Sequence, residues 1–293
     1  MRTRLTLCLL ALLLLPLWAQ AQTFQPDLGN PLLRGLTAWW RGVPGATGGD
    51  RIFDLSLSQN HGTLTNMGYG TTSGWSPATH PGGYMQLNFD ATDDYVETSV
   101  NPGTSVSTPL TLCSWVYVIS DTGDTVLISN RIANNYTGVW WSPTDGAHPL
   151  KPALTLCSES GPCTNQEKVF STNAIALNTW YHLCTTYDGS QTTAGIALYQ
   201  NGVAVATTLA TDTGFAAWTD RPWRLGANRN TTVGEILNGA MADTMVWNRA
   251  LTAAEIAALY QQAVLGHPAL QVASTRTFAS LLQLFGAFFP FFR

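Results

Sequence analysis

The stretch from Gly234 to Tyr260 places the tightest constraint on what this chain can fold into. Alternation over residues 240–247 predicts a partly buried strand, one face carrying Ala240, Ala242, Thr244 and Val246 and the other Met241, Asp243, Met245 and Trp247. Thr252 and Glu255 then form a Thr-x-x-Glu capping box, which satisfies backbone amides at the start of a helix. Apolar side chains follow at helical spacing, at Ile256, Leu259, Tyr260 and Ala263. We therefore expect a strand that completes a sheet, followed by one capped helix that packs.

The segments before this stretch are typical of short β-strands. The strongest β signals lie at residues 110–119, 125–130, 137–142, 153–157, 180–187, 196–200 and 203–207. Asn201-Gly202 predicts a type I′ hairpin turn, because both residue types tolerate positive φ. About a dozen short strands with almost no helix predict an all-β fold, an antiparallel β-sandwich (jelly roll) with one short C-terminal helix.

The first 21 residues are typical of a secretory signal peptide. Arg2 and Arg4 precede an apolar run from Leu5 to Leu17, and Ala19-Gln20-Ala21 fits a cleavage site. The alternative is a membrane anchor, but the run is about 13 residues long and a spanning helix needs roughly 20. We therefore expect the mature protein to be secreted or at the cell surface, with a linker over 22–34 and the jelly-roll domain over 35–265.

The last segment, residues 266–293, differs in character from the domain before it. It ends in an apolar, Phe-rich run that is short for a membrane span, and Pro290 would end a helix early. One interpretation is a tail that docks on its own domain or stays disordered. The other is contact with a membrane or a partner through residues 277–293.

Composition argues against nucleic acid as a partner. Only 11% of the residues are charged and the net charge is −4, whereas nucleic-acid-binding domains carry a clustered basic face. Of the five cysteines, Cys8 lies in the signal segment, which leaves four in an exported chain and suggests two disulfides. The short spacing favours Cys157 with Cys163, and Cys113 with Cys184 then follows by elimination.

Several motifs in order resemble the concanavalin A-like lectin/glucanase superfamily, and within it the laminin-G-like jelly rolls and the pentraxins. They span roughly residues 35–262 and comprise Leu110-Thr-Leu-Cys-Ser-Trp-Val-Tyr117, Trp180-Tyr-His-Leu-Cys-Thr-Thr-Tyr-Asp-Gly189, Ile196-Ala-Leu-Tyr-Gln-Asn-Gly-Val203, Arg224-Leu-Gly226 and the stretch from Gly239 to Tyr260. The resemblance implies a sandwich fold. Pentraxins link the strands that match Cys113 and Cys184, which supports that pairing.

The resemblance also implies where metal could bind. The positions that match the pentraxin calcium ligands hold neutral amides and a cation, at Asn134-Asn135 and Ala227-Asn-Arg-Asn230, and calcium prefers a ligand set with carboxylates; that site is not expected here. Laminin-G-like domains often hold a structural Ca²⁺ elsewhere, and Asp54 and Asp243 match those motif positions. The alternative is that Asp54 caps its own turn and Asp243 accepts hydrogen bonds within the sheet.

Aromatic and amide side chains are the remaining candidates for ligand binding. Sugar rings stack on Trp and Tyr, while Asn and Arg bond their hydroxyls. On the face that pentraxins use, the candidates are Asn134, Asn135, Tyr136, Trp140, Trp141, Asn228, Arg229 and Asn230. Adjacent residues of a strand point to opposite faces, so one of Trp140 and Trp141 is expected in the core.

No arrangement of acidic residues points to catalysis. Glucanases of this superfamily place paired carboxylates on one strand, and no Glu-x-Asp-x-Glu arrangement occurs among Glu97, Glu159, Glu167, Glu235 and Glu255. The sequence therefore predicts a secreted, non-catalytic module that binds an extracellular glycan or protein ligand. The alternative is a structural or adhesive surface protein that uses the sandwich as a scaffold and its C-terminal tail for attachment.

Overall fold

The computed structural model of the chain describes residues 24–26, 29–42, 49–68, 70–98, 107–121, 123–131, 138–144, 146–158, 163, 165–214, 221–229, 234–265 and 271–273. Residues 27–270 form one compact unit. In a separate unit, β1 (Phe24–Pro26) pairs antiparallel with β19 (Gln271–Ala273). The signal segment and residues 277–293 lie outside the described residues. Within the described part of the chain, no helix is long and apolar enough to cross a membrane.

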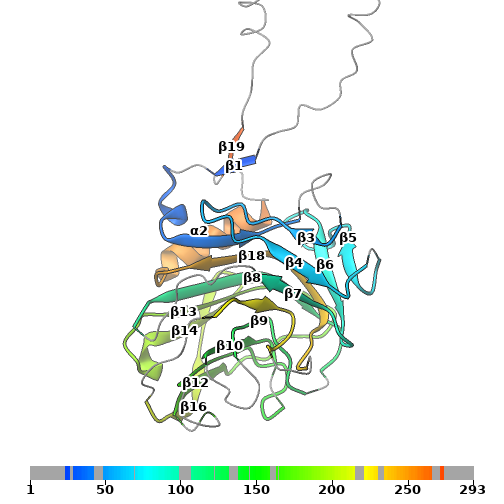
Figure 1. The fold of residues 1–293 in the computed structure, drawn as a ribbon. Helices are drawn as coiled ribbons and strands as arrows, with labels where there is room; N and C mark the ends of the chain where they lie inside the picture. The colour runs from blue at the N-terminus through cyan, green and yellow to red at the C-terminus, as the bar shows by residue number, and fades with distance from the viewer. Residues whose placement is uncertain are drawn as a thin grey trace, which may run out of the picture. The chain divides into compact units, whose positions relative to one another are not determined.

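The main unit is an antiparallel sandwich of two sheets (Figure 1). The nine-stranded sheet has the order β16-β12-β11-β10-β9-β17-β7-β4-β3. Its strands are β3 (Arg51–Ile52), β4 (Gly62–Thr65), β7 (Tyr95–Thr98), β9 (Ile128–Ser129), β10 (Gly138–Ser142), β11 (Ala153–Cys157), β12 (Gln166–Ser171), β16 (Thr207–Asp212) and β17 (Arg224–Leu225).

The eight-stranded sheet has the order β15-β14-β13-β8-β18-β6-β5, with β2 paired to β18. Its strands are β2 (Leu36–Trp40), β5 (Gly74–Ser76), β6 (Gln86–Asp90), β8 (Leu110–Val118), β13 (Trp180–Tyr187), β14 (Ile196–Gln200), β15 (Val203–Val205) and β18 (Asn238–Trp247). Short 3₁₀ turns, η1 (Pro31–Leu33) and η2 (Thr193–Gly195), lie outside the sheets. The predicted all-β sandwich is confirmed.

The core lies between the sheets and follows from the alternation of each strand. In the nine-stranded sheet, one row of cross-strand neighbours is buried, and it runs through Leu64, Val96, Leu225, Ile128, Trp141, Leu154 and Val169. Inward side chains of the facing sheet, such as Leu112, Val116 and Val246, belong to the same cluster. Because successive strand residues point to opposite faces, the residues between these apolar ones face outward.

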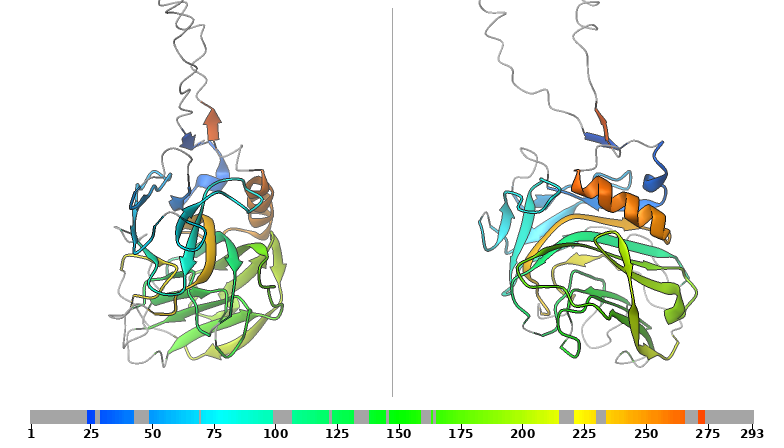
Figure 2. Two further views of the ribbon diagram at one scale, coloured as in Figure 1. Left: turned by 90° about the vertical axis from the view of Figure 1, so that its right-hand side faces the viewer. Right: turned by 180° about the vertical axis from the view of Figure 1, so that it is seen from behind.

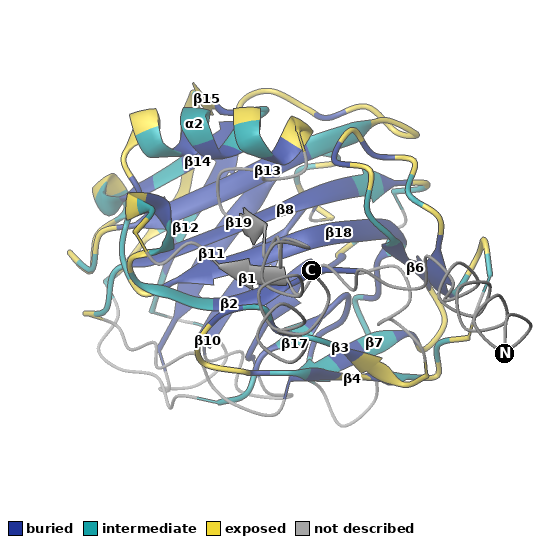
Figure 3. Ribbon diagram, turned by 90° about the horizontal axis from the view of Figure 1, so that it is seen from above, coloured by how far each residue is buried: buried dark blue, intermediate teal, exposed yellow. Residues whose placement is uncertain are grey.

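The helix α2 (Ala253–Val264) covers the outer face of the eight-stranded sheet, as Figures 2 and 3 show. Thr252 accepts from the Glu255 amide and Glu255 bonds the Thr252 amide, so the predicted capping box is confirmed. Ala263 and Tyr260 pack on Trp115 and Ala242, which point outward from β8 and β18. The helix therefore seals aromatic surface that the sheet alone would leave in water.

The simple alternation predicted for residues 240–247 is wrong in its middle. The pairing of β18 with β8 shifts between Ala242 and Met245, and Asp243 has a φ of 53°. This β-bulge puts Met241 and Val246 on the same, core-facing side, although alternation assigns them to opposite faces. The buried Ser114 hydroxyl lies 3.1 Å from the Ala242 carbonyl and 2.8 Å from Thr244 Oγ1, so it satisfies polar groups at the bulge.

Two local predictions are confirmed alongside the fold. Both disulfides form as expected, Cys113–Cys184 between β8 and β13 and Cys157–Cys163 at the end of β11. The Asn201-Gly202 turn between β14 and β15 has φ values of 51° and 79°, as a type I′ turn requires.

Candidate functional site

The outward face of the nine-stranded sheet carries a continuous row of polar and aromatic side chains. Strand register makes direct neighbours, in order, of Glu97, Arg224, Ser129, Trp140, Thr155 and Lys168. We call this set the outer row. Each member precedes or follows a core residue of its own strand, so the burial of Trp141 and Leu154 forces Trp140 and Thr155 outward.

An open groove lies over part of the outer row. Its volume is about 560 Å³, and its floor includes Trp140 of β10, Thr155 of β11 and Lys168 of β12. Arg131, which follows β9, and Glu235, which precedes β18, are also among its lining residues. We call this cavity the Trp140 groove. A cavity of this size holds a small ligand or one residue of a polymer.

Two cations cover the indole of Trp140 within the groove. The guanidinium carbon of Arg131 lies 4.8 Å from the ring centroid, and Lys168 Nζ lies 5.3 Å from it. Only 5% of Trp140 is exposed. Among the residues that the structure describes, Trp140 Nε1 and Thr155 Oγ1 are buried and have no hydrogen-bond partner. Buried polar atoms of this kind normally have a partner, but both atoms are covered by the protein and are not accessible from the groove.

An ion-pair cluster continues the outer row beyond Ser129. Glu97 bonds Arg224 at 3.0 Å and also contacts Arg229, and the Arg224 guanidinium lies 3.9 Å from the Tyr95 ring centroid. Burial lowers the pKa of both guanidinium groups below the ordinary value, partly offset by Tyr95. With two arginines on one glutamate, this end of the row has an excess of positive charge.

The structure brings together some of the ligand-binding residues that the sequence suggests. Trp140 lines the groove, and Arg229 belongs to the ion-pair cluster on the same face. The interpretation of Trp141 as a ligand residue is corrected, because it is wholly buried in the core. Asn228 is also buried, and its backbone bonds Gly234 and Arg224. The other candidates lie outside the described residues, namely Asn134, Asn135, Tyr136 and Asn230.

Sequence reasoning missed Arg131, Thr155, Lys168 and Glu235. Alternation in Gln166–Ser171 does place Lys168 opposite to Val169, and that signal indicates an outward side chain. Alternation does not predict which residue of the adjacent strand lies beside Lys168. Thr155 and Lys168 reach Trp140 only through the register of β10, β11 and β12.

Asp54, the first residue matched to a calcium ligand, serves as a hydrogen-bond acceptor for its own loop. Its Oδ1 accepts from the Trp39 and Ser56 amides at 2.7 and 2.8 Å, and its Oδ2 accepts from the Ser56 hydroxyl and the Asn60 amide at 2.8 and 2.7 Å. The side chain is buried. These donors occupy the lone pairs that a cation would need.

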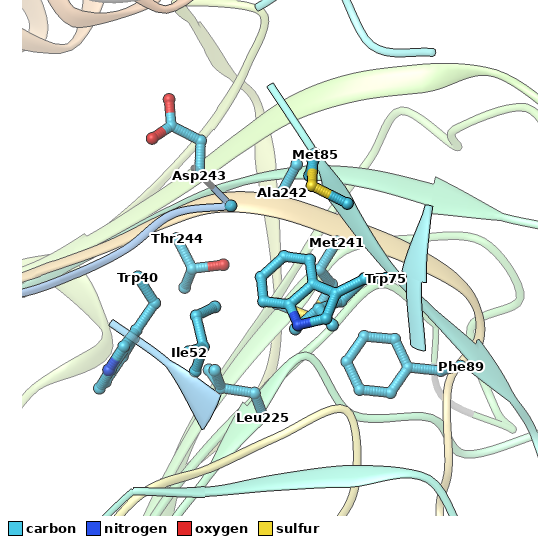
Figure 4. Close-up of a pocket in the computed structure, with 12 residues that line it drawn as sticks. Trp40, Ile52, Trp75, Met85, Phe89, Leu225, Met241, Ala242, Asp243 and Thr244 are labelled. Carbon is cyan, nitrogen blue, oxygen red and sulfur yellow. The ribbon is translucent and has the colours of Figure 1, made fainter. Parts of the chain in front are cut away.

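Asp243, the second matched residue, lies at the bulge of β18. Figure 4 shows its carboxylate on the opposite side of the strand from Thr244 and the core. Oδ1 accepts from Trp39 Nε1 at 2.6 Å and lies 3.9 Å from Arg41 Nε. Arg41 is fully buried, and this desolvation lowers its pKa to about 10 despite the opposing effect of Asp243. A carboxylate beside a buried guanidinium and an indole N–H does not fit a calcium site.

A third group of carboxylates lies in the turn between β6 and β7. Ligand oxygens of Asp90, Asp93 and Asp94 lie within 4.8 Å of one another. Asp94 is buried, and burial raises its pKa to about 6, while hydrogen bonds from the Ser73 hydroxyl and the Asp90 amide act in the opposite direction. These bonds give Asp94 a structural role in closing the turn.

Comparison with known proteins places the sequence in a broad class. A sequence profile described as the concanavalin A-like lectin/glucanases superfamily matches residues 90–257. No sequence among the curated proteins matches the chain.

Solved structures of toxin binding domains share the fold. The binding domain of Paraclostridial Mosquitocidal Protein 1 is similar at a TM-score of 0.55 and 14% identity, over 81% of this chain and 56% of that one. The botulinum neurotoxin serotype C1 binding domain is similar at a TM-score of 0.54 and 12% identity, over 79% of this chain and 53% of that one. A structure of botulinum neurotoxin type C, a toxin whose cell entry is described as dependent on interaction with two ganglioside molecules, is similar at a TM-score of 0.53 and 12% identity. The similarity covers 79% of this chain and 52% of that one. The chain thus spans slightly more than half of these structures, and at such identities the likeness shows the fold alone.

Proposed function

The chain belongs to the concanavalin A-like lectin/glucanase superfamily, and on that premise we propose that it is an exported, non-catalytic module that binds glycan in the Trp140 groove. The fold by itself is compatible with many activities. The proposal therefore depends on the groove, and on one observation above the others. An open cavity of about 560 Å³ lies on the outward face of the sheet, and its lining combines the aromatic side chain of Trp140 with amide and charged groups.

The chemistry of the groove suits a sugar. The Arg131 and Lys168 cations in the lining are donors for hydroxyl oxygens. Gln166, also in the lining, carries an amide that both donates and accepts. Similar folds in toxin binding domains are described with ganglioside and with a sialylated ligand, which supports glycan as the ligand class.

The carboxylates of this face support binding without catalysis. Glu97 forms ion pairs with Arg224 and Arg229, so both of its oxygens are already engaged within the protein. Asp124 Oδ1 accepts from the Gly146 amide at 2.7 Å. Two disulfides and the superfamily match support an extracellular location.

A glycan array probed with purified protein tests the proposal. We expect binding to a restricted set of glycans, and we expect Trp140→Ala to abolish most of it, since the groove loses its aromatic side chain and Arg131 and Lys168 lose the ring on which they are positioned. Trp180→Ala is the matched control, because Trp180 projects from the other sheet and packs on Tyr117. Thermal melting of each variant checks that it is folded.

Two results would contradict the proposal. One is the absence of binding to any glycan on the array, and the other is equal binding by wild type and Trp140→Ala. In either case the structural or adhesive alternative gains support, and deletion of residues 277–293 followed by a measurement of assembly and surface attachment would test it directly.

A further inference from the structure

The strand β16 forms one edge of the nine-stranded sheet, where it pairs with β12. Five of its six residues are exposed, and Leu209 is exposed to 55%. The register shifts between Lys168 and Val169, whose partners are Thr211 and Leu209, so Ala210 has no partner on β12. A strand that buries so little apolar surface opens locally at a lower free-energy cost than the strands of the core.

Two carboxyl groups face each other across this pairing. Glu167 of β12 and Asp212 of β16 are direct cross-strand neighbours, so their side chains lie on the same face of the sheet. Glu167 is wholly buried, whereas Asp212 is exposed. Like charges directly opposite each other destabilise a strand pair. When two carboxyl groups share one site, the pKa of one of them is raised because both cannot ionise at little cost.

Hydrogen bonds from three sides keep the two carboxyl groups in place. Glu167 Oε1 accepts from the Gly214 amide at 2.8 Å, just after the end of β16. The Thr193 hydroxyl, from η2, donates to Asp212 Oδ2 at 2.8 Å. The pair therefore connects β12, β16 and the turn that contains η2.

The other groups around Glu167 do not neutralise it. Burial, followed by the hydrogen bond with Asp212, raises its pKa to about 7, and no cation contributes to the shift. Tyr187, at the end of β13, interacts with Glu167 and with Asp188. Burial, opposed by a hydrogen bond from the Gln191 amide, raises the pKa of Tyr187 to about 12, so its phenol stays neutral. Strand β14, which also contacts β12, carries no charged side chain.

The residues on either side of Glu167 belong to the Trp140 groove. Gln166 and Lys168 precede and follow it on β12, and both line the groove. The Gln166 amide donates to Thr213 Oγ1 at 2.8 Å, and the Thr213 amide donates to the Gln166 carbonyl at 3.2 Å. Separation of β16 from β12 therefore removes bonds that hold this side of the groove.

We propose that Glu167 and Asp212 form a pH-sensitive latch that fixes the edge strand β16 against β12. In the closed latch the two groups share one proton, and the Glu167 hydroxyl donates to the Asp212 carboxylate. When this proton is lost to solvent, the carboxylates repel each other and β16 separates, together with Thr213 and Gly214. Because the pKa of Glu167 lies above its unfolded-state value, the latch is closed at acidic pH and opens as the pH rises through about 7.

Hydrogen–deuterium exchange of the full chain, followed by mass spectrometry, tests the latch without any ligand. Peptides that cover residues 207–214 are compared with peptides of β8, after correction for the effect of pH on the chemical exchange rate. The two conditions are about pH 5.5 and about pH 8, on either side of the Glu167 pKa. We expect the protection of β16 to fall about tenfold relative to β8, since one pH unit above a shifted pKa changes the ratio of closed to open states about tenfold.

Two variants assign the effect to the pair. Glu167→Gln cannot ionise, and its side-chain amide donates to Asp212 as the protonated acid does, so β16 should stay protected at the higher pH. Asp212→Asn removes the repulsion from the other side and should have the same effect. Asp94→Asn is the matched control, because it changes another carboxyl group with a raised pKa, about 6, in the turn between β6 and β7. It should leave the wild-type loss of protection unchanged, and thermal melting at acidic pH checks that each variant is folded.

Three results would overturn the latch: equal protection of β16 at both pH values, an equal loss of protection in Glu167→Gln, or a loss that β8 shares. The consequence for the groove rests on the proposed glycan-binding function. A glycan identified on the array should bind wild type more weakly at the higher pH and bind Glu167→Gln equally at both, and equal wild-type binding at both would overturn this coupling. Failure to bind any glycan removes the proposed function, whereas the exchange measurement still decides whether the latch exists.

Discussion

The buried ion pair at the bulge of β18 is the residue-scale feature with the clearest energetic consequence. Arg41 is fully buried, and its guanidinium lies beside the Asp243 carboxylate and 3.0 Å from the Tyr84 ring centroid. We expect Asp243→Asn to destabilise the fold by about 3 kcal/mol, because it leaves a buried charge without its counterion. Asn tolerates the positive φ of this position, so the change removes charge with little backbone strain.

Denaturant unfolding measures this effect. Asp50→Asn serves as the control, since Asp50 is exposed, and it should change the free energy of unfolding by less than about 0.5 kcal/mol. Equal stability of Asp243→Asn and wild type would show that the pair contributes nothing to the fold.

Glu167, on the core-facing side of β12, gives a pH dependence. Burial, followed by the neighbouring Asp212, raises its pKa from 4.5 to about 7, while the Gly214 amide bonded to Oε1 acts in the opposite direction. Because the pKa of Glu167 is higher in the folded than in the unfolded state, its protonated form stabilises the fold. This contribution is complete at pH values below the unfolded-state pKa, and it is lost as the pH rises through the folded-state pKa. We therefore expect the melting temperature to fall by on the order of 5 °C between about pH 4.5 and 7.

Thermal melting across this pH range is the measurement, with Glu167→Gln as the comparison. The glutamine cannot ionise, so its profile should be flatter over the same window. Identical slopes for the two proteins would assign the pH dependence to other groups, of which buried Asp94, with a pKa raised to about 6, is the next candidate.

At the scale of elements, the two disulfides join strands over very different lengths of chain. Cys113 and Cys184 are 71 residues apart and link adjacent strands β8 and β13, whereas Cys157 and Cys163 are 6 apart. In the chain-entropy model, removal of the long-range bridge costs about 4 kcal/mol and removal of the short one about 2 kcal/mol. We expect the Cys113→Ala/Cys184→Ala double variant to be the less stable of the two.

Paired denaturation curves of the two double variants test this order. The comparison is internal, since each variant loses one bridge and keeps the other. A larger loss of unfolding free energy for Cys157→Ala/Cys163→Ala would contradict this order. It would mean that the bridge in the turn after β11 contributes more to stability than the bridge between β8 and β13.

At the scale of the whole molecule, the two residues matched to calcium ligands already have partners within the protein. Asp54 is satisfied by amides and a hydroxyl, and Asp243 by an indole and a guanidinium. We expect a calcium chelator to leave the melting midpoint unchanged, and added Ca²⁺ to have no effect. A lower midpoint in chelator would contradict this expectation and support a structural Ca²⁺, since a bound ion stabilises the folded state by mass action.

The outward faces of the two sheets differ in what covers them. Helix α2 covers the outward aromatic surface of one sheet, while the outward face of the other carries the Trp140 groove. The proposed ligand-binding groove therefore lies on the sheet that the helix leaves uncovered.

Local physics in the sequence was enough for several strands, such as β8, β13 and β14, and for the capping box, the hairpin and the cysteine pairing, but it did not predict β5, β12 or β16. Each depends on residues close together in the chain or on a choice among few pairings: alternation, a Thr-x-x-Glu motif, positive φ at Asn201-Gly202, and spacing. Alternation also required that Trp140 and Trp141 face opposite sides. It did not say which of them faces the core.

The tertiary structure decided the rest, because those features depend on register between strands distant in sequence. The bulge that turns Asp243 toward Trp39 and Arg41 arises where β18 meets β8 and β2. Trp141, rather than Trp140, lies in the core between the sheets, because it is the neighbour of Ile128 and Leu154 in the core row. Lys168 reaches the Trp140 ring only across β11. The sequence alone thus predicted the sandwich, whereas pairing between distant strands determined which side chains line the Trp140 groove.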